Sequence, residues 1–273
     1  MSTGSTGRNA YFHVDSPCTL ILYHIRLAAS LEIGVNRPWR DGLKFGRIME
    51  SGGPMLRYKC ILLDHDDTIV ESTMQIHYPA FLETLRTLRP EEDPISIIDF
   101  VSTCYHPGFM GLCAKYEFDE DEMVEEYAIW KKYTRAHTPQ AYPGIREILL
   151  KFRNEGGKIV VISHSESTEI NRDYRHNFGF EPDLVFGWEL GEEKRKPNPY
   201  PIDQTLRLLG LRSEDCIMID DLKLGLTMVR QRDIPFVAAG WSHFIDEIRD
   251  ALKKDADHYC TRVEELDEIL FLK

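Results

Sequence analysis

The sequence predicts an α/β fold: a doubly wound parallel sheet with an inserted α-helical domain. Three observations support this prediction. Short apolar runs bounded by Gly, Pro, Asp or Ser recur along the chain, as in strands that are buried on both faces of a parallel sheet. Segments with helical periodicity alternate with these runs. One stretch of about sixty-five residues breaks the alternation, because it has helical periodicity and no convincing strand.

The predicted strands are five apolar runs, which read YKCILLD, GKIVVIS, DLVFG, CIMIDD and PFVAAG in chain order. A helix is expected in PGIREILLKFRNEG, where Ile145, Ile148, Leu149 and Phe152 recur at helical spacing after Pro143 and before a pair of glycines. Alternating strands and helices imply parallel pairing. Sheets of this type bind their ligands at the carboxyl ends of the strands.

The same pattern divides the chain into three parts. Residues 55–72 and 138–273 are predicted to form the core domain, and residues 73–137 a helical cap domain inserted after the first strand. The insertion contains two amphipathic runs, MQIHYPAFLETLRTL and DEDEMVEEYAIWKKYTRAH. The second run begins with acids and ends with bases, which complements a helix dipole.

Residues 1–54 differ from the rest of the chain. They hold six Lys or Arg against four Asp or Glu, a net charge of +2, and show no sustained periodicity. We expect a poorly ordered extension or a wrongly assigned start, with translation beginning at Met55. A targeting segment is the alternative, since the stretch is relatively poor in acids.

The amino-acid composition argues against some classes of partner and favours one cellular compartment. The net charge of -12 and the pI of about 5.3 disfavour a nucleic-acid partner. The most apolar early segment, CTLILYHIRLAAS, is too short to span a membrane and carries His24 and Arg26. Six cysteines without a C-x-x-C pair suit a reducing cytosol better than a disulfide framework or a zinc site. We therefore expect a cytoplasmic protein with no membrane partner, whose oligomeric state is left open.

Carboxylates gather where two predicted strands end. Asp64, Asp66 and Asp67 follow the first strand, and Asp220 and Asp221 end CIMIDD. A lone D-x-D would fit a turn after a strand equally well. If the two strands are neighbours, however, like charges about 4 Å apart repel by roughly 4 kcal/mol at an effective dielectric constant near 20. A divalent cation would offset that repulsion, and an all-oxygen site with open positions suits Mg²⁺.

Two further residues complete a candidate phosphate site. Ser163 ends the strand KIVVIS, where its hydroxyl and the following N–H groups, that of His164 first, are placed to bind a phosphoryl oxygen. Lys196 precedes a proline, which restrains the local backbone. Taken singly, the serine is equally typical of a turn and the lysine of a solvated surface.

Together these motifs resemble the haloacid dehalogenase superfamily of phosphohydrolases, from Lys59 to about Ala239. LLDHDDTIVES is similar to the first motif, D-x-D-G-T-[LV]; YPGIREILLKFRNEGGKIVVISHS, KPNP and CIMIDDLKLGLTMVRQRDIPFVAAG are similar to the segments of the other three. The position of the insertion and the YPGI sequence are most similar to the phosphoglycolate phosphatase and beta-phosphoglucomutase branch. The resemblance implies a Rossmann-like core with a helical cap.

The resemblance also implies roles for individual residues. Asp64 would be the nucleophile, and Asp66 would act as the acid and then the base. Mg²⁺ would be bound by Asp64, by the backbone carbonyl of Asp66 and by Asp221. Ser163 and Lys196 would balance the charge of the phosphoryl group, with His164 beside them. Thr68 would support the loop, and Arg135 and His137 in the cap would meet the leaving group.

The chain departs from the family pattern at three places. Asp67 replaces the usual glycine of the first motif, in a turn where Asp is among the less costly alternatives. Asp220 stands at another usual glycine while Gly225 stands where many members carry a second Asp, so we expect Asp220 to replace the missing carboxylate at the metal site or at Lys196. His65 is interpreted as a packing or loop residue. His77 is given no role.

The predicted function is therefore a Mg²⁺-dependent phosphatase that hydrolyses a small phosphorylated metabolite through an aspartyl-phosphate intermediate. A phosphomutase of the beta-phosphoglucomutase type is the main alternative, since it would use the same residues. A non-catalytic binding or regulatory module on the same fold is a further alternative, and would require a defective site. A dehalogenase is disfavoured, because halide leaving groups do not need the acid that Asp66 supplies.

Overall fold

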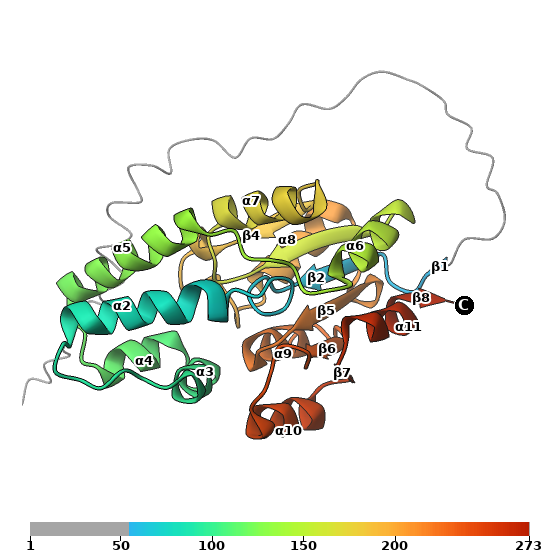
Figure 1. Ribbon diagram of the computed structural model, residues 1–273. Coiled ribbons are helices and arrows are strands. Elements are labelled where there is room, and N and C mark those ends of the chain that lie inside the picture. Colours follow the sequence, from blue (N-terminus) through green and yellow to red (C-terminus); the bar gives the residue numbers. More distant parts are fainter. Residues whose placement is uncertain (1–54, 273) are drawn as a thin grey trace, which may run out of the picture. The chain divides into compact units, whose positions relative to one another are not determined.

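A six-stranded parallel sheet forms the centre of the protein (Figure 1), whose computed structural model describes residues 55–272. The strand order is β4-β3-β2-β5-β6-β7. These strands are β2 (Cys60–Leu63), β3 (Lys158–Ile162), β4 (Leu184–Phe186), β5 (Cys216–Asp220), β6 (Phe236–Ala239) and β7 (His258–Cys260). The first five are the predicted strands; β7 escaped prediction because it is short and begins with an exposed histidine. A separate antiparallel pair joins β1 (Met55–Leu56) to β8 (Phe271–Leu272).

Helices cover both faces of this sheet, which confirms the predicted doubly wound α/β class. Alternate side chains of β2 point into different apolar clusters: Ile61 and Leu63 into one, Cys60 and Leu62 into the other, and all four are fully buried. The first cluster includes side chains of α6 (Ile145–Asn154), α7 (Ser167–Phe178) and α11 (Leu266–Leu270). The second includes side chains of α8 (Tyr200–Leu209), α9 (Lys223–Arg230) and α10 (Asp246–Asp255). Short 3-10 turns are η2 (Trp188–Leu190), η3 (Ser213–Asp215) and η4 (Val263–Glu265).

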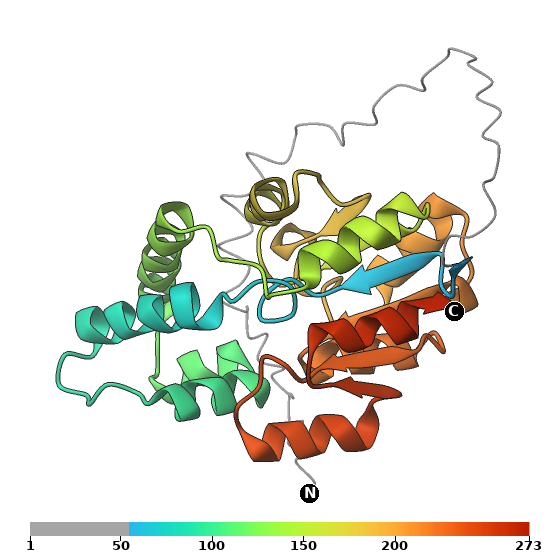
Figure 2. The ribbon, with the colours of Figure 1, turned by 45° about the vertical axis from the view of Figure 1, so that its right-hand side comes forward.

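The inserted helical segment, residues 73–137, has an apolar cluster of its own. Its elements are η1 (Thr73–His77), α2 (Tyr78–Leu88), α3 (Ile97–Tyr105), α4 (Phe109–Lys115) and α5 (Glu120–Ala136). Phe81, Leu85 and Phe100 are buried at the centre of this cluster. In both views these helices gather beyond the carboxyl end of β2 (Figures 1 and 2). The two predicted amphipathic runs are confirmed as η1 with α2 and as α5, whereas α3 and α4 were not anticipated.

Two paired stretches of chain connect the inserted helical segment to the sheet. The outgoing chain pairs with the returning chain through an antiparallel bridge between Val70 and Ala141. The Tyr142 N–H donates to the Ile69 carbonyl at 3.0 Å, and the Glu71 N–H donates to the Gln140 carbonyl at 2.9 Å. The entry and the exit of the insertion are therefore held together beside the loop that follows β2.

Two expectations from the sequence are not tested by the structure. The predicted extension, residues 1–54, with its alternative readings as a wrong start or a targeting segment, lies outside the described residues. The domain boundaries stay a prediction. Within residues 55–272, no helix combines the length and the apolarity needed to cross a bilayer.

One buried carboxyl group stands out in the inserted helical segment. Glu126 lies on α5 and is only 6% exposed. Burial raises the pKa of Glu126 to about 7, although nearby His77 acts in the opposite direction. Ionising this group costs free energy in the folded state, so the cost appears as the pH rises above the pKa of an unfolded glutamate and is complete above pH 7.

Replacing this carboxyl should therefore remove a pH-dependent loss of stability. We expect Glu126→Gln to match the wild type near pH 4 and to be more stable at pH 8, by up to about 3 kcal/mol. Denaturant unfolding at several pH values measures the difference. Glu125→Gln, at an exposed position of the same helix, is the control and should show no such trend. Parallel pH profiles for Glu126→Gln and the wild type would contradict this explanation.

Candidate active site

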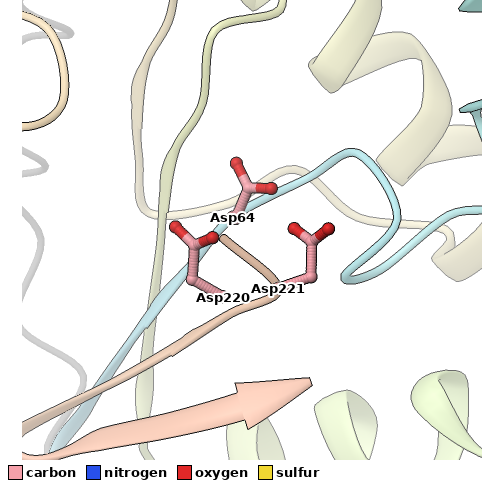
Figure 3. A group of neighbouring side chains, drawn as sticks. All are labelled: Asp64, Asp220 and Asp221. Atoms are coloured by element: carbon pink, nitrogen blue, oxygen red, sulfur yellow. The ribbon is translucent and has the colours of Figure 1, made fainter. Parts of the chain in front are cut away.

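Three buried aspartates meet at the carboxyl edge of β2 and β5. The two strands are neighbours, and the Asp64 N–H donates to the Ile219 carbonyl at 3.0 Å. One carboxylate oxygen from each of Asp64, Asp220 and Asp221 lies within 4.8 Å of the others, and none of the three residues is more than 4% exposed. Figure 3 shows the carboxyl groups side by side, Asp64 from the chain after β2 and the other two from the end of β5. The metal site predicted from the sequence required these two strands to be neighbours, and they are.

Lys196 lies between two of these carboxylates. Its Nζ donates to Asp64 Oδ1 at 2.7 Å and to Asp220 Oδ2 at 2.9 Å, and its side chain is 3% exposed. Burial lowers the pKa of Lys196, but Asp220 and Asp64 outweigh burial and raise it above its ordinary value. The lysine is therefore charged at neutral pH and neutralises part of the acidic cluster.

Asp220, the last residue of β5, and Asp221, which follows it, have different partners. Asp220 also accepts the Leu222 N–H on Oδ1 at 2.7 Å, so both of its oxygens already have protein donors. Burial raises the pKa of Asp220 to about 7. Burial, and then the charges of Asp64 and Asp220, raise the pKa of Asp221 well above its usual range. A site that disfavours its own negative charge in this way favours a bound cation.

The glycine at position 225 leaves the space that Asp220 occupies. A Cβ added to Gly225, on α9, would lie 2.2 Å from Asp220 Oδ2. The two departures in the fourth motif are therefore sterically linked, because the Asp220 side chain occupies the space that a side chain at position 225 would need. Of the two partners suggested for Asp220, the structure shows a direct contact with Lys196.

Asp66 lies apart from the buried cluster and is more accessible, with 25% of its side chain exposed. Its Oδ1 lies 3.1 Å from His77 Nε2, and its Oδ2 accepts the hydroxyls of Ser165 at 2.5 Å and Ser163 at 3.4 Å. Burial acts to raise the pKa of Asp66, but His77 and the hydrogen bond from Ser165 outweigh it and lower the pKa below its usual range. Asp64 and Asp66 are thus close in sequence and differ in environment.

His77, to which the sequence assigned no role, is oriented by Trp130 of α5. The Trp130 indole N–H donates to His77 Nδ1 at 3.1 Å, and the two rings stack. Because indole can only donate, Nδ1 carries no proton in this geometry, and the Nε2–H donates to Asp66. The inserted helical segment therefore contacts Asp66 through one histidine, and nothing in the sequence spacing marks Trp130 as its partner.

The other predicted residues surround this centre. Thr68 Oγ1 donates to Asp221 Oδ1 at 3.2 Å and accepts the Asp221 N–H at 3.1 Å, which supports its expected role in holding the loop. Ser163 Oγ accepts the Ser165 N–H at 3.1 Å. His164 Nε2 lies 3.1 Å from the Lys196 carbonyl, and burial, with Lys196 beside it, lowers the pKa of this histidine to about 3. Arg135 lies on the last turn of α5 with an exposed side chain, so its contact with a leaving group stays a prediction.

Both unusual residues of the first motif have specific contacts. Asp67 adopts φ of 54°, the left-handed conformation expected where relatives have glycine, and its Oδ1 accepts the Thr73 N–H at 3.1 Å. His65 is buried, as a packing residue would be, but its Nε2 also lies 3.1 Å from Asp173 Oδ2 on α7. Sequence reasoning also missed His243, whose Nε2–H donates to the Asp221 carbonyl at 2.7 Å.

This arrangement defines the class of protein: an α/β enzyme with a buried aspartate cluster and a lysine at the carboxyl edge of a parallel sheet. Residues 61–239 match the family of haloacid dehalogenase-like hydrolases. The match covers more than half of the chain, so the protein belongs to this family and is an enzyme of its phosphatase type.

Individual relatives agree with this family. The chain is 22% identical over 172 residues to the pyrophosphatase PpaX of Bacillus cereus (strain B4264), covering 61% of this chain and 76% of the relative. It is 26% identical over 192 residues to the phosphoglycolate phosphatase of Aquifex aeolicus (strain VF5), covering 68% and 86%. The solved structure of CbbY from Rhodobacter sphaeroides in complex with phosphate has a TM-score of 0.61 at 19% identity, covering 77% of this chain and 96% of that one. At that identity the likeness concerns the fold.

The contact between Gly225 and Asp220 leads to a test. We expect Gly225→Ala to displace Asp220 from Lys196 and to lower the free energy of unfolding by about 1–3 kcal/mol, as over-packing does. Denaturant unfolding measures the loss. The same substitution in an Asp220→Gly background should cost clearly less, because the obstructing side chain is gone. Equal costs in the two backgrounds would show that Asp220 is not what excludes a side chain at position 225.

Proposed function

We propose that this protein is a Mg²⁺-dependent phosphatase that hydrolyses a small phosphorylated metabolite through an aspartyl-phosphate intermediate. The observation that carries this proposal is the cluster of Asp64, Asp220 and Asp221 with Lys196 hydrogen-bonded within it. The cluster brings three carboxylates and a fixed positive charge to one edge of the sheet, where they would serve as nucleophile, metal ligands and phosphate-binding group. In-line phosphoryl transfer needs these groups and little other chemistry from a protein.

The donor set fits a hard divalent cation. Three buried carboxylates supply oxygen atoms close together, and Lys196 neutralises only part of their charge. Mg²⁺ prefers one or two carboxylates with water and a substrate phosphate, so Asp64, Asp221 and the backbone carbonyl of Asp66 would hold it. When bound, the cation would neutralise the charge of the substrate phosphate and of the attacking carboxylate. Asp220 would support the site through Lys196.

The nucleophile in this proposal is Asp64. Lys196 holds Asp64 Oδ1 at 2.7 Å, which fixes the carboxylate orientation and leaves Oδ2 to attack phosphorus. The phosphoryl oxygens would be bound by the Lys196 ammonium, by the Ser163 hydroxyl and by the N–H groups that follow it, beginning with His164. Water then attacks the aspartyl phosphate in a second displacement and releases inorganic phosphate.

Asp66 would move the protons of both steps. It would protonate the leaving oxygen of the substrate, and afterwards accept a proton from the incoming water. The hydrogen bonds from His77 and Ser165 stabilise its charged form, so their loss on substrate binding would raise the pKa of Asp66 toward the range that an acid needs. His77 therefore contributes to the protonation state of Asp66.

The inserted helical segment is proposed to act as the cap over this site, with the core formed by residues 55–72 and 138–273. His77 and Trp130 already connect it to Asp66, and Arg135 lies where the chain returns to the sheet. The relatives reported above are named as a pyrophosphatase and a phosphoglycolate phosphatase. We extend to this chain only their common substrate class, a small phosphorylated compound.

Two alternatives are less well supported. A phosphomutase would need the phosphoryl group returned to a sugar, whereas the relatives reported above are named for hydrolysis. A non-catalytic module would need a defective site, but Asp67 and Gly225, its suspected defects, are accommodated without loss of any carboxylate at the cluster.

The described cysteines are all free, which supports action in the reducing cytoplasm.

The nucleophile can be tested directly. We expect Asp64→Asn to lower turnover of an aryl phosphate in the presence of Mg²⁺ by at least about 10³-fold, because an amide oxygen cannot form the acyl phosphate. Release of inorganic phosphate measures the rate. Asp246→Asn, an exposed carboxylate 86% accessible on its side chain, is the matched control and should retain full activity. Wild-type turnover by Asp64→Asn would rule out this nucleophile.

Mg²⁺ affinity should depend more strongly on Asp221 than on Asp220. We expect Asp221→Asn to abolish measurable Mg²⁺ binding, and Asp220→Asn to weaken it by roughly 10-fold to 100-fold, the usual cost of losing a group that supports a ligand. Isothermal titration calorimetry measures both affinities without turnover. If Asp220→Asn binds Mg²⁺ as tightly as the wild type, Asp220 acts on Lys196 alone. Phosphatase activity that survives complete chelation would remove the metal from the proposal.

A further inference from the structure

A buried pair of side chains ties the proposed nucleophile loop to a helix. His65 lies between Asp64 and Asp66 and is 1% exposed. Its Nε2 lies 3.1 Å from Asp173 Oδ2, and Asp173, on α7, is 2% exposed. The ring of His65 also stacks near Tyr174, with the ring centres 6.0 Å apart. The side chain between the two proposed catalytic acids is therefore fixed to α7 by a polar contact shielded from water.

The same helix holds the returning end of the inserted helical segment. Arg172 donates to Asp173 Oδ1 from Nε at 2.8 Å, and its other nitrogens donate to the carbonyls of Thr134 and His137, the latter at 3.2 Å. These carbonyls belong to the last turn and the C-terminal cap of α5, which the helix itself leaves without donors. One guanidinium thus connects the end of α5 to the carboxylate that holds His65.

Asn177 adds a second attachment one turn further along α7. Its side-chain amide donates to the Pro139 carbonyl at 3.1 Å, and its side-chain oxygen accepts the Ala141 N–H at 3.2 Å. The returning chain, residues 137–141, is therefore bound to α7 at both ends of the stretch.

The loop after β2 depends on the backbone of His65 as well. The His65 carbonyl accepts the N–H groups of Ile69 at 2.9 Å and Val70 at 3.2 Å. Val70 in turn forms the bridge to Ala141 of the returning chain. Helix α7 therefore contacts the loop through His65, and the returning chain through Arg172 and Asn177. The loop and the returning chain also contact each other, through the bridge between Val70 and Ala141.

We propose that His65, Asp173 and Arg172 are positioning residues that couple the geometry of the loop carrying Asp64 and Asp66 to the end of α5. Displacing α5 changes the contacts of Arg172, which shifts Asp173 and thereby His65. The catalytic part of this inference rests on the proposed function; the structural coupling does not.

The chemistry of the pair favours positioning over stability. Burying a charged or polar pair gains little over burying apolar side chains of the same volume, because desolvation offsets the attraction. A hydrogen bond, however, has a required distance and angle, so it specifies one orientation of the loop where an apolar contact would accept several. A displacement of about 1 Å at the reacting groups is enough to cost on the order of 100-fold in rate.

The decisive variant is Arg172→Met, since within residues 55–272 the hydrogen bonds of its side chain go to Asp173 and to the carbonyls of Thr134 and His137, and not to the loop or the aspartate cluster. Its side chain is 30% exposed. We expect faster hydrogen–deuterium exchange in peptides covering residues 64–72 and 134–142, and a kcat lower by roughly 10-fold with little change in KM. Arg172→Lys should recover part of kcat, because it keeps one charged donor. Arg175→Met is the matched control: Arg175 lies on the same helix, pairs with Glu181 and is 57% exposed, and its loss should change neither readout.

His65→Leu and Asp173→Asn test the buried pair itself. Both should accelerate exchange in residues 64–72 and lower kcat more than KM changes. Wild-type exchange in residues 64–72 of Arg172→Met would overturn the coupling, and unchanged kcat in both His65→Leu and Asp173→Asn would overturn the positioning role. If the wild type hydrolyses no phosphate ester, the proposed function fails, while the exchange experiment still decides whether α5 and the loop are coupled.

Discussion

The structure depends on the repulsion among carboxylates that end two neighbouring buried strands. β2 and β5 pair in parallel, so Asp64 and the pair Asp220 and Asp221 are forced to one edge of the sheet. Burial raises the free energy of each charge, and proximity adds to it. Lys196 offsets part of this cost by bonding to Asp64 and Asp220 together. The remaining negative charge favours a bound cation, which would in turn attract a phosphate group.

Several features around the cluster follow from that constraint. Gly225 has no side chain because Asp220 fills the space beside it. Thr68 and His243 both bond to Asp221, one through the carboxylate and the other through the backbone carbonyl, and so fix its orientation. These two donors matter because the Asp221 oxygens are buried, and a buried oxygen left without a hydrogen bond costs more free energy than a hydrogen bond gains.

Environment separates the two acids of the first motif. Asp64 lies in the buried cluster against Lys196, whereas Asp66 is partly exposed and bonded to His77 and two serine hydroxyls. The Asp64 carboxylate is held by a buried hydrogen bond, whereas the Asp66 carboxylate is within reach of solvent. His77 belongs to the inserted helical segment, and Arg172 bonds to the end of α5, so that segment contacts both Asp66 and the support of the loop. The inserted helical segment and the loop after β2 are thereby connected physically.

The sequence by itself determined five of the six strands of the parallel sheet and the residues of the acidic cluster. Buried parallel strands appear as apolar runs, and charges at their ends are readable without coordinates. Ser163 and His164 were also marked by their place at a strand end, and Thr68 and Lys196 by their place in motifs that resemble those of the family. Only the tertiary structure decided the partners: Asp220 bonds to Lys196, Asp66 to His77 and Ser165, and His65 to Asp173, over a separation of 108 residues. Such contacts depend on which elements pack together, and side-chain periodicity carries no information about pairing across distant elements.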